Sequence, residues 1–244
     1  EKPHPAPETT AGAVCRRSGG FSRGRHPRVF FSTARVFAEL STGRGVGAPH
    51  AVAARHDRGM PVLLSARAIV RPPVPLLTAG EARALRIDVS SREYARVRPG
   101  IHASSAGVSR LAPWERYALR VHAFALACPG ATMCLESAAV LHGLPSFGEC
   151  RDIHVFAAHR SASRRFGDVS VHTSVDPREV VEIAGVRVTS LLDTVVDLAR
   201  ALPPAQALAV LDAATSPAQG GAVTRDEVRQ RATQRADQRG ARQL

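Results

Sequence analysis

Apolar and polar residues alternate in three short segments of the second half of the chain, DIHVFA, DVSVHT and GVRVTS. The alternate apolar positions are Ile153 and Val155, Val169 and Val171, and Val186 and Val188. A period of two is typical of a strand with one buried face and one wet face. The three segments therefore predict a small antiparallel sheet.

Apolar residues at three- and four-residue steps predict helices beside this sheet. The segment PWERYALRVHAFALAC repeats them on one face that we expect to be buried: Trp114, Tyr117, Val121, Phe124 and Cys128. TMCLESAAVLHGLPSF is nearly uncharged, so we expect a helix capped by Thr132, ended by Gly143 and buried on most sides as a hub for packing. SLLDTVVDLARAL, PPAQALAVLDAAT and a polar segment from Thr224 predict three further helices.

The segment between residues 77 and 100 predicts two short helices and a hairpin. Thr78 and Glu81 have the spacing of a capping box, and Asp88 or Ser90 can cap a second helix. A stretch of alternating arginines and a turn at Pro99 follow. Helix, turn, helix and basic hairpin is the order of a winged helix-turn-helix.

These patterns together predict an α/β (α+β) protein in which a winged-helix-like module precedes a small antiparallel sheet packed with helices. Residues 1–59 lack sustained periodicity, so we expect a disordered basic arm or an untranslated extension before a start at Met60. The module is expected at 60–112 and the helix-plus-sheet core domain at 113–200. Residues 201–244 are expected to be C-terminal helices that the end of the sequence truncates.

Positive charge is concentrated at the front of the chain. Lys and Arg outnumber Asp and Glu by ten to four in residues 1–60 and by eight to three in 61–112. The ratios are nine to ten in 113–200 and six to four in 201–244, so eleven of the twelve net charges precede residue 113. Non-specific affinity for nucleic acid follows local Lys and Arg contacts with phosphates. Any such surface is therefore expected in the front module.

The candidate nucleic-acid contacts are the arginines and serines of that module: Arg83, Arg86, Ser90, Ser91, Arg92, Arg96 and Arg98. Such side chains contact phosphates and groove edges. A small domain that only flanks the core is the alternative interpretation. Lys2 is the single lysine, which excludes a P-loop, a Schiff-base lysine and a PD-(D/E)xK nuclease site within this sequence.

A second candidate surface for an anion or a protein partner lies on the wet side of the predicted sheet and its loop: His154, Arg160, Arg164, Arg165, His172 and Arg187. An ordinary solvated strand face is the alternative. His142 has no partner at triad or metal spacing, so we interpret it as structural. Asp193 and Asp197 are expected to face water or Arg200.

We expect no catalytic residue, metal or cofactor, because no other grouping has the required spacing. Four cysteines without a CxxC pair are typical of a reduced, cytoplasmic protein. The sequence has neither an apolar run of about 18 residues nor a signal peptide, so no membrane partner is expected.

The order CLESAAVLHGLP, IHVF, HRSASRRFG, VSVHT and VTSLLDTVVDLARAL resembles the abortive-infection AbiE-type (type IV toxin–antitoxin) antitoxins and transcriptional regulators. The resemblance spans roughly residues 77–244. It implies a winged helix joined to a small α/β domain, duplex DNA as a partner, and a cognate toxin as a second one. The same front half occurs in proteins that end in a domain similar to the very-short-patch-repair endonuclease. Two alternatives therefore stay open: the targeting part of a nuclease whose catalytic domain lies beyond residue 244, and a module that neutralises a toxin.

Overall fold

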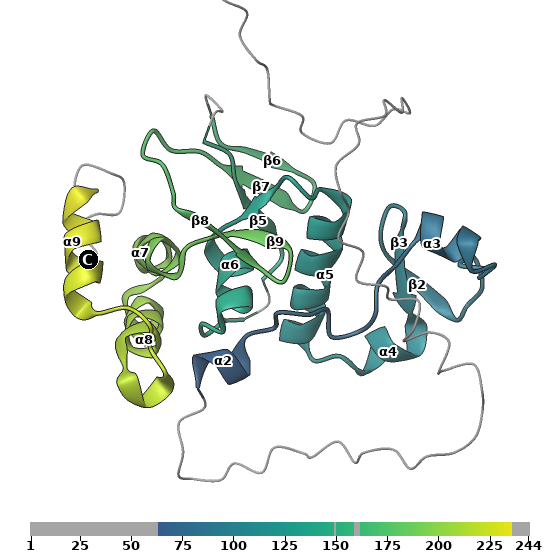
Figure 1. The fold of residues 1–244 in the computed structure, drawn as a ribbon, viewed down its shortest axis with the longest axis horizontal. Coiled ribbons are helices and arrows are strands. Elements are labelled where there is room, and N and C mark those ends of the chain that lie inside the picture. The colour runs from purple at the N-terminus through teal and green to yellow at the C-terminus, as the bar shows by residue number, and fades with distance from the viewer. Residues whose placement is uncertain (1–62, 149, 159–161, 236–244) are drawn as a thin grey trace, which may run out of the picture. The chain divides into compact units, whose positions relative to one another are not determined.

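The computed structural model describes residues 63–148, 150–158 and 162–235, which form two β-sheets and the helices around them (Figure 1). The expected arm at 1–59 and the candidate Arg160 lie outside the described residues. The fold class is confirmed: a small antiparallel sheet and a larger sheet are both packed with helices. No helix in the described ranges has the length and apolar character needed to cross a membrane.

The smaller sheet has the strand order β1-β3-β2 and is antiparallel throughout. Its strands are β1 (Leu77–Thr78), β2 (Tyr94–Arg98) and β3 (Ile101–Ser104), and it lies beside the short helices α3 (Ala79–Ala84) and α4 (Ser105–Arg110). The short helix α2 (Leu64–Arg67) packs against α6 (Leu135–His142) instead. The predicted capping box opens α3. The Thr78 hydroxyl accepts from Glu81 N–H at 3.1 Å, and the Glu81 carboxylate accepts from Thr78 N–H at 2.9 Å.

The predicted second helix of the helix-turn-helix is wrong. The chain passes from α3 to β2 through turns, and Arg86 has a left-handed φ of 54° that breaks the helical run. The Asp88 carboxylate accepts from the backbone N–H of Ser90 at 2.9 Å and from its hydroxyl at 2.6 Å. Side chains that bond to the nearby backbone in this way compete with helix formation. The predicted hairpin, by contrast, is present, with Gly100 at a left-handed φ of 74° in its turn.

A β-bulge in this hairpin separates two arginines that the alternation pattern placed on one face. Arg96 is opposite His102, but Arg98 is opposite Ile101, so one extra residue lies between the two pairs. Side chains directly opposite each other share a face, and a bulge re-aims the residue that follows it. Arg98 consequently shares the face of buried Ile101, whereas Arg96 stays on the opposite, exposed face.

The larger sheet is mixed, not antiparallel as predicted, and has the order β6-β7-β5-β4-β9-β8. The three predicted strands are β5 (Ile153–Phe156), β7 (Val169–His172) and β9 (Val186–Thr189). The additional ones are β4 (Thr132–Met133), β6 (Arg164–Phe166) and β8 (Val180–Ile183). The pairs β5–β7 and β4–β9 are parallel. Strands β5 and β7 run in the same direction because β6, the strand between them in sequence, pairs antiparallel with the outer edge of β7.

The five longer helices are α5 (Pro113–Ala127), α6 (Leu135–His142), α7 (Leu191–Ala201), α8 (Pro204–Thr215) and α9 (Arg225–Gln234), with a 3-10 turn η1 (Pro217–Gln219) after α8. Helices α5 and α6 pack on the larger sheet, α7 packs on α6, and α8 and α9 pack on α7. Helix α6 begins later than predicted, because Thr132 belongs to β4. Gly143 ends α6 with a φ of 78°, as expected.

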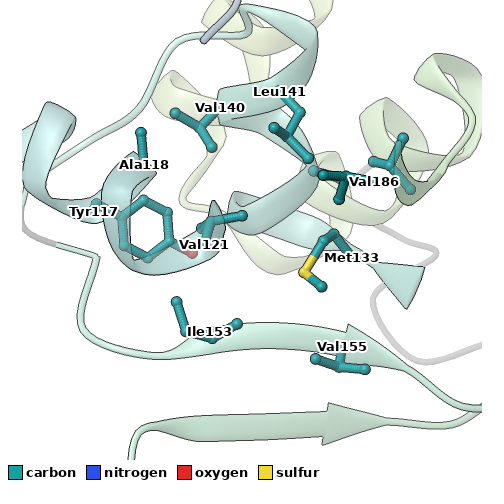
Figure 2. Packing of buried hydrophobic residues seen from close by; sticks show 11 residues of the cluster. Tyr117, Ala118, Val121, Met133, Val140, Leu141, Ile153, Val155 and Val186 are labelled. Atoms are coloured by element: carbon teal, nitrogen blue, oxygen red, sulfur yellow. The ribbon is translucent and has the colours of Figure 1, made fainter. Parts of the chain in front are cut away.

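The core confirms that α6 is the hub. Its Ala138, Val140 and Leu141 pack with α5, β4 and β5 in one cluster (Figure 2), and its Ala139 packs with α7 and α8 in another. The predicted buried face of α5 is only partly right. Tyr117 and Val121 are buried, whereas Trp114 is 58% exposed at the first turn of the helix.

Candidate nucleic-acid interface

Four arginines of the front module are exposed: Arg83 on α3, Arg86 and Arg92 in the turns after it, and Arg96 on the outer face of β2. In the part of the chain that the structure describes, none of them forms an ion pair with a carboxylate. Burial and pairing therefore leave all four guanidinium groups available to a ligand. Ser90 is exposed beside them and Ser91 is half-buried.

The acidic groups close to these arginines do not cancel the charge. Glu81 is engaged in the cap of α3, and Glu93 is exposed. The hydrogen bonds from Ser90 hold the pKa of Asp88 below its usual value, so this carboxyl is ionised at neutral pH. Residues 63–112 contain eight arginines against these three acids. Local excess charge of this kind is the electrostatic feature that phosphate backbones recognise.

Arg98 does not lie on this exposed surface. Its Nη2 donates to Asp168 Oδ2 at 2.7 Å, and its guanidinium lies 4.9 Å from the centroid of the Phe124 ring on α5. Only 14% of the Arg98 side chain is exposed. Arg98 is therefore not exposed like the other four, because the bulge in β2 directs it toward the body of the protein, and its role as a nucleic-acid contact stays a prediction.

The histidines of the second candidate surface bind each other instead of an external anion. His154 Nδ1 and His172 Nε2 are 2.9 Å apart, and His154 Nε2 is 3.3 Å from Glu136 Oε2. The ring centroids are 5.1 Å apart and the ring planes differ by 23°. With the two bonded nitrogens only 2.9 Å apart, both must lie between the centroids, so the rings meet edge to edge and do not overlap face to face. Burial, followed by the charge of His154, lowers the pKa of His172. Because the two rings bond each other and His154 also contacts Glu136, the pair makes a poor anion site.

The arginines of that surface are separated as well. Arg165 donates to Asp152 Oδ1 at 2.7 Å, and its neighbour Arg164 projects to the opposite face of β6. Arg187 is exposed and is opposite Glu182 in the β8–β9 pair. The alternative, a solvated strand face with local pairing, describes these residues better than a single anion site.

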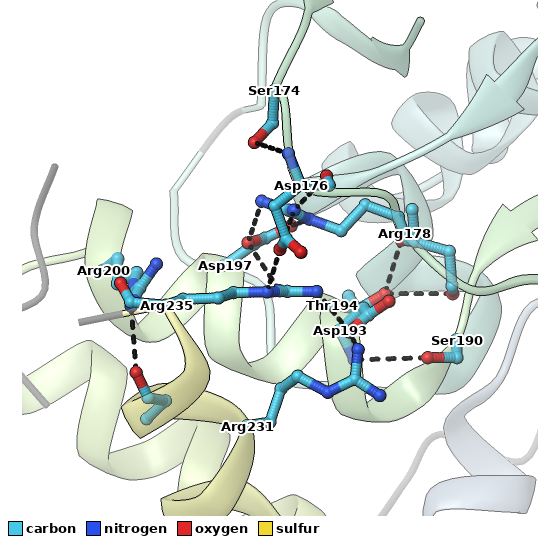
Figure 3. A network of polar contacts seen from close by, with 12 residues as sticks. Ser174, Asp176, Arg178, Ser190, Asp193, Thr194, Asp197, Arg200, Arg231 and Arg235 are labelled. Carbon is cyan, nitrogen blue, oxygen red and sulfur yellow. Dashed lines mark hydrogen bonds and ion pairs between the residues drawn. The ribbon is translucent and has the colours of Figure 1, made fainter. Parts of the chain in front are cut away.

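Asp193 and Asp197 on α7 do not face water, but Asp197 interacts with the charge of Arg200, the other partner that was expected. Asp193 is fully buried and pairs with Arg235 at 2.7 Å and Arg231 at 2.9 Å (Figure 3). Asp197 pairs with Arg178 at 2.8 Å, and Arg235 also pairs with Asp176. The ion pairs of this network join three carboxylates to three guanidinium groups. The sequence signal that we missed is the i, i+4 spacing of Arg231 and Arg235 at the end of α9.

His142 has the structural role expected for it. Its Nε2–H donates to the carbonyl of Thr189 at 2.8 Å, and burial lowers its pKa. His122 of α5 makes the same kind of bond to Ile69 at 2.8 Å, and burial lowers its pKa too. Each ring fastens the loop or strand that it contacts, because a buried neutral imidazole needs one such partner.

In the described ranges no group of three or more His, Cys, Asp or Glu side chains has the arrangement of a metal site. Comparison of the chain with protein-family models and with curated proteins gives no match.

Proposed function

We propose that this chain binds duplex DNA through phosphate contacts from the exposed arginines of the α3–β2 segment. One observation carries the proposal: Arg83, Arg86, Arg92 and Arg96 are all exposed and have no carboxylate partner among the described residues, whereas half of the described arginines of the body pair with a carboxylate. Solvent-exposed guanidinium groups that lack protein partners are the usual donors to phosphate oxygens.

The resemblance to AbiE-type regulators suggests what this DNA binding is for. We infer a cytoplasmic, non-catalytic transcriptional regulator or antitoxin that acts by occupying operator DNA. Since the turns at residues 87–93 replace a recognition helix, phosphate contacts would supply most of the affinity. Base reading would be left to the β2–β3 hairpin, an element that can enter a groove.

The test is a fluorescence-anisotropy titration of the full chain with duplex DNA from upstream of its own gene and with a scrambled duplex. The variant Arg86→Ala/Arg92→Ala/Arg96→Ala removes three of the contacts. Each phosphate contact contributes about 0.9 to the slope of log K against log salt, so the slope should fall by about 2.7. At about 0.1 M salt the affinity should fall on the order of 100-fold.

The matched control is Arg151→Ala/Arg225→Ala/Arg229→Ala, which removes the same charge from exposed positions outside the module. Its slope should change by less than half as much, because its arginines are not in the interface. Equal losses in the two variants would mean that net charge, and not this surface, governs binding. A wild-type chain that binds neither duplex at about 50 mM salt would overturn the proposed function.

A further inference from the structure

Two arginines from different elements converge on one carboxylate oxygen. Arg98 at the end of β2 and Arg120 of α5 both donate through Nη2 to Asp168 Oδ2, at 2.7 Å and 2.8 Å. Asp168 lies in the turn between β6 and β7 and its side chain is 46% exposed. The oxygen is thus a negatively charged atom held by two cations at a position that solvent can reach.

The two guanidinium groups are held in place independently of Asp168. Arg98 lies over the ring of Phe124, and Arg120 also donates to the carbonyl of Arg151. The Nε of Arg98 is buried and lacks a hydrogen-bond acceptor among the described residues. The two guanidinium groups therefore carry more N–H donors than the described residues supply acceptors for. In an ion pair that is purely structural, buried donors are normally all satisfied.

The charges at this point do not balance. Burial alone would raise the pKa of Asp168, but the hydrogen bonds and charges of Arg120 and Arg98 outweigh it and hold the pKa below its usual value. One ionised carboxylate therefore faces two permanent cations. No other carboxylate in the described ranges pairs with Arg98 or Arg120. A site with one surplus positive charge remains.

We propose that Arg98 and Arg120 form a phosphate-binding site for the nucleic-acid backbone, in which Asp168 Oδ2 occupies the position of a phosphate oxygen until DNA displaces it. The inference rests on the proposed function. A phosphodiester presents two charged oxygens, so it can accept hydrogen bonds from both guanidinium groups at once. Asp168 acts as a built-in competitor that lowers the affinity for DNA.

The proposal predicts that neutralising Asp168 strengthens DNA binding. Asp168→Asn should tighten DNA binding about tenfold at about 0.1 M salt, the contribution of roughly one phosphate contact. Arg120→Ala should weaken binding by a similar factor. The double variant Asp168→Asn/Arg120→Ala should bind like Arg120→Ala alone, because the site that Asp168 occupies is then incomplete.

Asp226→Asn is the matched control, since Asp226 is an exposed carboxylate paired with a single arginine, Arg229, at 2.6 Å. It makes the same change in net charge and should alter affinity less than twofold. Asp168→Ser, a neutral residue that suits a turn, serves as a second variant, and the melting curve of each variant is recorded to show that it is folded.

Two failures are distinguishable in this experiment. If the wild-type chain binds no duplex, the proposed function fails. If the wild type binds but folded Asp168→Asn and Asp168→Ser bind no tighter than Asp226→Asn, the phosphate site at Arg98 and Arg120 is refuted. The site is also refuted if Asp168→Asn still increases DNA affinity when Arg120 is alanine, because the increase would then not depend on Arg120.

Discussion

Replacement of Asp193 by alanine should strongly destabilise the fold, because this carboxylate has three partners from two distant parts of the chain. Its Oδ1 accepts from Arg235 and Arg231, and its Oδ2 accepts from the backbone N–H of Glu179 at 2.7 Å. Asp193→Ala removes all three bonds at once. Helix α9 buries one apolar residue, Val228, along its described length. It then loses the ion pairs of Arg231 and Arg235 to Asp193 on α7.

The loss of stability depends on which partners of Asp193 can be solvated after the substitution. Arg231 is 27% exposed and can be resolvated, so its loss is small. Arg235 is 1% exposed and keeps only Asp176 and Asp197, while the N–H of Glu179 loses the carboxylate that it bonds. Removing one partner of a buried ion pair costs about 3–5 kcal/mol. We expect about 4 kcal/mol for Asp193→Ala, or a melting temperature lower by about 8–16 °C.

The assay is urea denaturation followed by circular dichroism, with thermal melting as a second measure. Asp212→Ala is the control, since Asp212 is exposed on α8 and its one side-chain bond, to Gln219, is 3.3 Å long. The control should cost less than about 0.5 kcal/mol. A loss below about 1.5 kcal/mol for Asp193→Ala would show that the network in Figure 3 contributes little net stability.

Two further predictions concern histidines and a glycine. Burial lowers the pKa of His122 and of His142, so the unfolded chain binds more protons below its histidine pKa of about 6.5. Stability is therefore complete above about pH 6.5 and falls as the pH drops below that value, by at most about 1.4 kcal/mol per pH unit for each ring. Urea midpoints against pH should show this fall, and His122→Gln/His142→Gln should flatten it; an unchanged slope contradicts the assignment. Gly143→Ala should cost about 3 kcal/mol or more, because its Cβ would overlap the Leu64 carbonyl, whereas Gly185→Ala, with a similar φ of 82° in open space, should cost only about 1 kcal/mol. Equal losses in urea denaturation would show that backbone strain, not the overlap, decides both.

Local signals in the sequence predicted the local features correctly. The capping box at Thr78 needs only a residue three positions away, and the cap at Gly143 needs only its own φ. The three strands with a period of two are likewise present. Their order in the sheet was not predictable in the same way. The parallel pairing of β5 and β7 depends on where the short strand β6 folds back, and a strand of three exposed residues gives almost no periodic signal.

The candidate site was predictable only where an arginine has no distant partner. Arg83, Arg86, Arg92 and Arg96 are exposed as expected. The orientation of Arg98 depends on a bulge and on a carboxylate 70 positions away. Asp193 lies 38 and 42 positions from its two arginines, so spacing within α7 could not reveal its burial. Sequence patterns report neighbours within a few residues, and ion pairs between elements fall outside that range.

Pairing, more than the count of arginines, decides where this protein presents positive charge. In the body, several arginines pair with carboxylates from distant elements, as in the network of Asp176, Asp193 and Asp197. The α3–β2 segment has too few acids for this, so its arginines stay exposed. Asp168 joins the two parts of the protein, because it pairs with Arg98 of the module and with Arg120 of the body. A ligand that exchanges with Asp168 would therefore touch both parts at once, which is why substitution at this one carboxylate should change DNA affinity more than substitution of any fully exposed acid.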